Sequence, residues 1–212
     1  MKKLCEGPDG LYYALLFQGG ITCFDKDIEK FLPVRFDKPL ELKDILDFCW
    51  NDGSLYLVTS QGLFESRIVR KTEGKHDFVL CLLNPEPVVR GKVAHLCSDG
   101  KTNLYFSVNQ RKVVHYDLVA KKTSLIKEYS VVNRLFLRHG YLWICRLWDD
   151  IICYDLKTNE ERVISMEGKD QSEFSNSYVT DLVLKDNRTF YLTTWNGLYK
   201  SVSYTHLTLP TT

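Results

Sequence analysis

Seven cysteines and five histidines are the residues of this 212-residue chain that could bind a metal ion, form disulfides or act in catalysis. Structural zinc sites commonly use pairs of such residues roughly two to four positions apart. The sequence has no Cys-x-x-Cys motif and no pair of histidines at ligand spacing. We therefore expect no metal site and no cofactor, and we interpret the thiols as small apolar core residues.

Catalysis by the histidines is not indicated. His95, His115 and His139 fall on separate predicted strands or turns, and no serine or cysteine motif accompanies them. The sequence also lacks a nucleophile elbow, a phosphate-binding loop and converging carboxylates. His115 is better explained as a packed strand residue, and the sequence predicts that this segment is not an enzyme.

Two tryptophans are better candidates for a functional site than the histidines or cysteines, because they could bind a ligand. Trp148 and Trp195 each precede a predicted strand, in turns that also hold amide or carboxylate side chains. An exposed indole can stack on a sugar ring or dock a protein partner, and polar neighbours then fix the orientation. The alternative is that each indole packs over a neighbouring element, which is a common role of so large a side chain.

The overall charge excludes one class of partner. The chain has 28 basic and 27 acidic residues, a net charge of +1 and no block of like charge, so we expect no nucleic-acid binding. No run of about 18 apolar residues occurs, so no membrane contact is expected within the segment. Met1–Leu4 resembles the start of a signal peptide, but Cys5–Gly10 follow in place of an apolar stretch.

A fivefold repeat must position these residues. A turn, an apolar residue and an aromatic residue recur at intervals of 38 to 49 residues, close to the length of one propeller blade. The aromatic markers are Tyr13, Tyr56, Tyr105, Trp143 and Tyr191. Each repeat contains short β-rich runs separated by turn residues. The sequence predicts an all-β fold: a β-propeller fragment of about five four-stranded antiparallel blades, the fifth incomplete, with no significant helix.

The expected blades cover residues 1–201. Their approximate bounds are 1–40, 41–88, 89–128, 129–170 and 171–201. Residues 202–212 abandon the repeat and resemble a translated sequencing adapter, so we expect a non-native tail there.

The turns between second and third strands gather on one face of a propeller. We expect that rim to bind ligand through Trp148, Trp195, Gln61, Asn109, Arg111, Asp149 and Asn196.

The last repeat carries a resemblance to a known family. Val179–Asp186, Thr189–Thr194 and Asn196–Tyr199 resemble the two-component regulator propeller repeat, and Leu55–Phe64 is similar. This resemblance implies a periplasmic sensor region of a bacterial hybrid two-component or histidine kinase receptor, answering to glycan-derived ligands and dimeric in the full-length receptor. It implies an oligosaccharide or other small ligand and no catalysis within these residues.

Two other functions stay open. A cytoplasmic propeller could serve as a platform for protein partners, because unpaired cysteines are more usual in a reducing compartment. A propeller enzyme acting on carbohydrate is the third alternative. Since fold does not fix function, the sequence that flanks this segment in its gene must decide between them.

Overall fold

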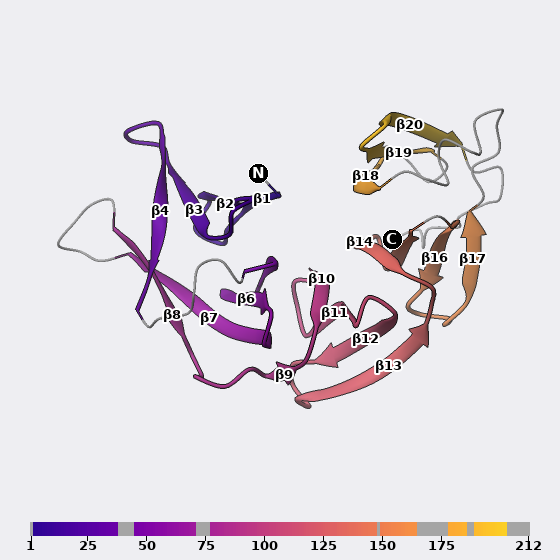
Figure 1. The fold of residues 1–212 in the computed structure, drawn as a ribbon, viewed down its shortest axis with the longest axis horizontal. Helices are drawn as coiled ribbons and strands as arrows, with labels where there is room; N and C mark the ends of the chain where they lie inside the picture. Colours follow the sequence, from indigo (N-terminus) through magenta and orange to yellow (C-terminus); the bar gives the residue numbers. More distant parts are fainter. Residues whose placement is uncertain are drawn as a thin grey trace. The chain divides into compact units, whose positions relative to one another are not determined.

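The structure is a computed structural model that describes residues 2–37, 45–70, 77–147, 149–164, 178–185 and 189–202, with the backbone alone at 201 and 202. All regular secondary structure in these ranges is β-strand, and the ranges contain no helix (Figure 1). Four-stranded antiparallel blades follow one another along the chain, and the fifth has three strands. The predicted all-β, propeller-like fold is confirmed.

The first two blades are joined at their outer edges. The first contains β1 (Lys3–Glu6), β2 (Tyr12–Leu15), β3 (Ile21–Asp25) and β4 (Lys30–Phe36), and the second contains β5 (Asp47–Asn51), β6 (Ser54–Thr59), β7 (Gly62–Arg70) and β8 (Phe78–Leu82). Strands β4 and β8 pair in parallel, with Val34 opposite Phe78. This pairing satisfies backbone groups that an outer strand would otherwise expose. The sequence did not indicate it.

After the short strand β9 (Val89–Arg90), the remaining strands form two four-stranded blades and one of three strands, each with its strands in chain order. They are β10 (Val93–Ser98), β11 (Asn103–Val108), β12 (Lys112–Asp117), β13 (Lys122–Glu128), β14 (Val132–Arg138), β15 (Tyr141–Arg146), β16 (Ile151–Asp155), β17 (Glu161–Ile164), β18 (Val179–Leu184), β19 (Thr189–Thr194) and β20 (Gly197–Val202). The short β9 leads from the second blade to the third and pairs with β7 of the second.

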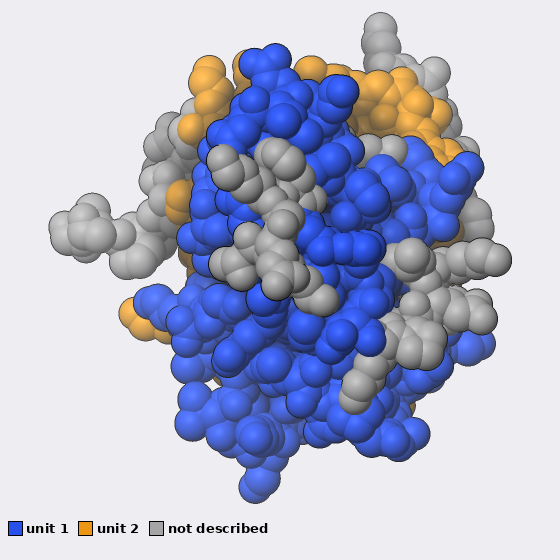
Figure 2. Space-filling model, turned by 90° about the vertical axis from the view of Figure 1, so that its left-hand side faces the viewer, with its two compact units in different colours: residues 1–109, 113–126 blue, residues 110–112, 127–212 orange. Residues whose placement is uncertain are grey.

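The chain forms two compact units, coloured separately in Figure 2. Residues 1–109 and 113–126 make up the first unit, and residues 110–112 and 127–212 make up the second. The first unit thus contains most of the first three blades, and the second contains the last two blades together with residues 110–112 and the end of β13.

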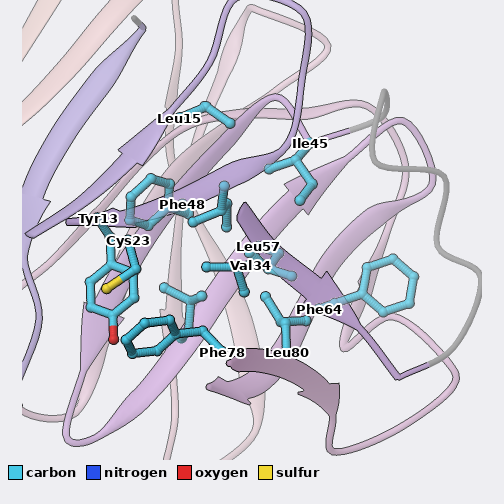
Figure 3. Close-up of a cluster of buried hydrophobic side chains, with 12 residues drawn as sticks. Tyr13, Leu15, Cys23, Val34, Ile45, Phe48, Leu57, Phe64, Phe78 and Leu80 are labelled. Atoms are coloured by element: carbon cyan, nitrogen blue, oxygen red, sulfur yellow. The ribbon is translucent and has the colours of Figure 1, made fainter. Parts of the chain in front are cut away.

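Apolar side chains fill the space between neighbouring blades within each unit. Tyr13 and Cys23 of the first blade pack with Phe48 and Leu57 of the second (Figure 3). A second cluster joins the second blade to the third. In the second unit the rings of Trp143 and Phe190 lie 5.2 Å apart between the fourth and fifth blades. The recurring aromatic residue is therefore a core residue in each of these interfaces.

The cysteines contribute to these cores. All seven lie in described residues, and none forms a disulfide. Cys23, Cys49, Cys145 and Cys153 are buried. Burial raises the pKa of Cys23 to about 11 and that of Cys153 to about 12, so both thiols are uncharged at neutral pH. The interpretation as apolar core residues is confirmed for these four.

A polar contact ties together the first strands of the three blades in the first unit. Asp47 accepts hydrogen bonds from Lys3 Nζ and from the Leu96 backbone N, each at 2.8 Å. Lys3 Nζ also lies 3.4 Å from the Leu96 carbonyl oxygen. Burial acts most strongly and would lower the pKa of Lys3, but the charge and hydrogen bond of Asp47, together with the nearby Cys49 and Cys5, outweigh it and leave the pKa raised.

Candidate ligand-binding rim

The turn between β19 and β20 lies at the edge where the fifth blade begins. The Trp195 backbone N donates to the Tyr178 carbonyl at 3.2 Å, which brings the turn against the residue that precedes β18. Thr194 fixes the turn, because its Oγ1 accepts from the Asn196 backbone N at 3.1 Å. Gly197 follows with φ +144°, a conformation that favours glycine.

Trp195 projects from this turn into solvent. Its side chain is 76% exposed, and its ring stacks on that of Tyr178 with centroids 5.0 Å apart and an interplanar angle of 19°. Tyr178 is itself 39% exposed. The pair therefore presents a preoriented aromatic surface, of the kind that binds the apolar face of a ring.

The exposure of Trp195 is a property of its position in the blade. The turns that precede Gly62 and Gly197 have the same strand register, and Ser60 occupies the place of Trp195 in the second blade. Ser60 is exposed even though Leu63, three residues later, is fully buried against the third blade. An indole at this position is therefore not required by the core.

Two more predicted rim residues lie against one segment of the second unit. The Tyr129 backbone N donates to the Arg111 carbonyl at 3.0 Å. Ser130 Oγ lies 3.3 Å from Asp149 Oδ2, and Arg146 Nη1 forms an ion pair with the same carboxylate at 2.5 Å. The structure thus brings Arg111 and Asp149 to residues 129 and 130, and the Arg146 pair offsets the charge of Asp149.

The other predicted residues are distributed as follows. Asn196 is exposed in the second unit, next to Trp195, and Gln61 and Asn109 are exposed in the first unit. Asn109 adopts a positive φ of 53°, so the third blade makes its turn without glycine. Trp148 lies outside the described residues.

Two exposed aromatic residues on or beside these turns were not expected from the sequence. The sequence does not indicate a role for Tyr178, because only the structure reveals that it stacks on Trp195. Phe17 is 72% exposed on the corresponding turn of the first blade, beside Gln18. Its place at the end of the apolar run Leu15–Phe17 made it look like a strand residue, and alignment of the five turns would have found it.

His115 takes the packed strand position that we predicted. Its ring stacks on Tyr105 at 5.2 Å, with Nε2 2.6 Å from Asn103 Oδ1 and Nδ1 3.2 Å from Ser124 Oγ. This series of serine, histidine and asparagine was not anticipated. Ser124 is exposed to solvent, however, and lacks the water-excluded setting in which such a serine becomes an effective nucleophile.

Within the described ranges, no group of three or more His, Cys, Asp or Glu side chains is arranged to hold a metal ion. The same ranges contain no helix that is long and apolar enough to cross a membrane.

Comparison with known proteins finds solved structures that share the fold of this chain. No family model matches the chain, and no curated protein matches it. A solved structure described as the extracellular domain of the hybrid two-component system BT4673 from B. thetaiotaomicron is similar, with a TM-score of 0.72, 14% identity and 98% of this chain covered. The extracellular domain of the hybrid two-component system BT3049 from the same organism gives a TM-score of 0.59 at 13% identity over 93% of this chain.

A third similar structure is an auxiliary nutrient-binding protein from Bacteroides thetaiotaomicron, with a TM-score of 0.56, 14% identity and 94% of this chain covered. At such identities the likeness concerns the fold alone. The chain spans 30%, 28% and 56% of the lengths of these three proteins.

Proposed function

We propose that the chain is the ligand-sensing propeller portion of a bacterial two-component signalling receptor, located in the periplasm and not itself catalytic. The observation that carries the proposal is the exposed Trp195 stacked on Tyr178 at the blade edge. The fold shared with extracellular domains of hybrid two-component systems supports it.

The ligand class follows from the chemistry of the rim. A flat aromatic surface suits the apolar face of a pyranose ring, and the amide of the neighbouring Asn196 suits its hydroxyl groups. Arg146 forms an ion pair with Asp149, which offsets the charge of that carboxylate. A neutral oligosaccharide derived from a glycan fits these features better than an anionic one.

A calorimetric titration of the protein with a panel of short neutral oligosaccharides tests this proposal. We expect one or more to bind, and Trp195→Ala to weaken that binding at least about tenfold, the loss expected when a stacking contact is removed. Tyr178→Ala should weaken it less, because Tyr178 orients the indole.

Val119→Ala is the matched control, because Val119 is 78% exposed on the turn between β12 and β13. It should leave affinity unchanged. Absence of binding across the panel would contradict the ligand class, and equal affinity of the wild type and Trp195→Ala would contradict the site.

A second candidate is a cytoplasmic propeller that serves as a platform for protein partners. Seven cysteines without a disulfide favour a reducing compartment. The exposed indole of Trp195 suits the anchoring of a protein partner equally well. Cell fractionation separates the two candidates, since the sensor must be recovered with the periplasm or membranes and the platform with the cytosol.

A further inference from the structure

The outer strand of the third blade has an open edge. Strand β13 comes last in the order β10–β11–β12–β13 (Figure 1). All of its side chains except that of Ile126 are exposed. Among the described residues, no strand pairs with its outer edge and no other backbone group bonds to it. A row of backbone N–H and C=O groups is therefore open to another strand.

The outer strands of the first two blades show that such edges do pair in this chain. Strands β4 and β8 form a parallel ladder and satisfy each other's backbone groups. The outer strand of the fourth blade, β17, has only four residues, and its Glu161 already binds Lys127 and Tyr129. Within the described ranges, β13 is thus the longest strand with an open edge.

The sequence of β13 is complementary to itself. In an antiparallel pair of two copies centred on Leu125, residues equally distant from Leu125 face each other. Lys122 of one copy then lies opposite Glu128 of the other. The pair occurs twice, because the arrangement has twofold symmetry. Opposite charges at directly opposed positions stabilise paired strands.

The centre of this arrangement is apolar. Leu125 is 58% exposed, and in the paired strands it would contact Leu125 of the second copy. Side chains alternate between the two faces of a sheet, so the leucine contact lies on one face and both charge pairs lie on the other. The contact removes a large exposed apolar side chain from water in each copy.

Other ways of pairing two copies of β13 are less favourable. A shift by one residue in one direction sets Lys122 opposite Lys127, and a shift in the other direction removes both pairs of Lys122 with Glu128. A parallel pair in register sets each charge opposite its own copy. Like charges at opposed positions destabilise a strand pair, so the charges of β13 favour the antiparallel register centred on Leu125.

We propose that the outer edge of β13 docks β13 of a second copy of this chain, antiparallel and in the register centred on Leu125. The two third blades then form one continuous sheet across the twofold axis. A second copy fits this edge better than an unrelated protein, because the complementary charges lie on the strand itself. The proposal is independent of the ligand proposed for the rim, since no residue of β13 belongs to the rim.

Sedimentation velocity of the 212-residue chain, from low to high micromolar concentration, tests the proposal. We expect a reversible equilibrium of monomer and dimer, which is weak because a single pair of strands buries little area. Glu128→Lys sets two positive charges opposite each other at both ends of the pair. It should raise the dissociation constant of the dimer at least about tenfold. Lys122→Glu should have the same effect through two negative charges.

Two restored pairings make the test specific to this register. An equimolar mixture of the Glu128→Lys and Lys122→Glu proteins should form a mixed dimer, because every lysine then faces a glutamate. A chain that carries both substitutions should dimerise like the wild type for the same reason. Lys30→Glu, at an exposed position of β4, is the matched control and should leave the dissociation constant unchanged. Equal urea midpoints establish that the variants are folded.

Three outcomes overturn the proposal. The first is a wild-type protein that stays monomeric over the whole range of concentration. The second is a dimer that both single substitutions leave unchanged, which would assign the association to another surface. The third is loss of the dimer in both single variants without recovery in the mixture or in the doubly substituted chain.

Discussion

Single residues in this chain have roles that depend on where the blade places them. The indole of Trp143 is fully buried between two blades, whereas the indole of Trp195 is exposed on a turn. In the sequence Trp143 is a marker within a predicted strand and Trp195 lies in a predicted turn. Their positions in the repeat are the only sequence feature that distinguishes the buried indole from the exposed one. The stacking partner of Trp195 could not be predicted, because Tyr178 lies 17 positions away outside the repeated motif.

Asp47 provides a test of the polar contact between blades. Asp47→Ala would leave the Leu96 N–H without this acceptor and Lys3 without its opposite charge. We expect a loss of about 2–4 kcal/mol in the free energy of unfolding, measured by urea denaturation. Asp77→Ala removes a pair with the exposed Arg35 and should cost less than about 1 kcal/mol. Equal losses would show that the Asp47 contact is no stronger than a surface pair.

The buried thiols predict a loss of stability at alkaline pH. The pKa of Cys23 is about 11 in the folded protein and near 9.0 in the unfolded chain. The unfolded chain therefore releases its proton first, and stability falls as the pH rises from about 9 towards 11. At pH 10 the loss from this thiol is about 1 kcal/mol.

Urea denaturation of the reduced protein at pH 7 and pH 10 checks this expectation. Cys23→Ala should show a drop between the two pH values that is about 1 kcal/mol smaller than that of the wild type. The cavity left by the substitution affects both pH values alike and cancels in the difference. An identical drop in the two proteins would exclude the thiol as the cause.

At the scale of elements, the sequence predicts the features that recur in each blade, namely its strands and the turns between them. The aromatic markers and the turn residues between them predicted the strands and their grouping into blades. Features that occur once could not be read from a repeat. The parallel pairing of β4 with β8 and the short β9 are such features, since each depends on contacts between segments distant along the chain.

Gly62 and Gly197 form a matched pair for testing the contact between β9 and Gly62. Both have φ +144°, so alanine strains the backbone equally at the two sites. At Gly62 the added methyl would also meet the Val89 carbonyl. We expect Gly62→Ala to cost about 2 kcal/mol more than Gly197→Ala in urea denaturation of the protein of residues 1–201. Similar costs would mean that β9 moves aside without penalty.

At the scale of the whole molecule, the blades of each unit provide a frame, and the turns carry the residues of the proposed site. The fold explains why Trp195 is exposed to solvent, but function depends on the site that the fold carries. The net charge of +1 fits a neutral ligand and gives no long-range attraction for nucleic acid. In the receptor that we propose, this site acts through a signalling module encoded in the same gene.

The natural gene, sequenced through both ends from an independent source, tests the central claim most directly. The account predicts one reading frame with a secretion signal before the blades, at least one further blade after residue 201, and then a membrane-spanning helix and a histidine kinase. A short reading frame without a secretion signal or a membrane-spanning helix would contradict the sensor and favour the cytoplasmic platform.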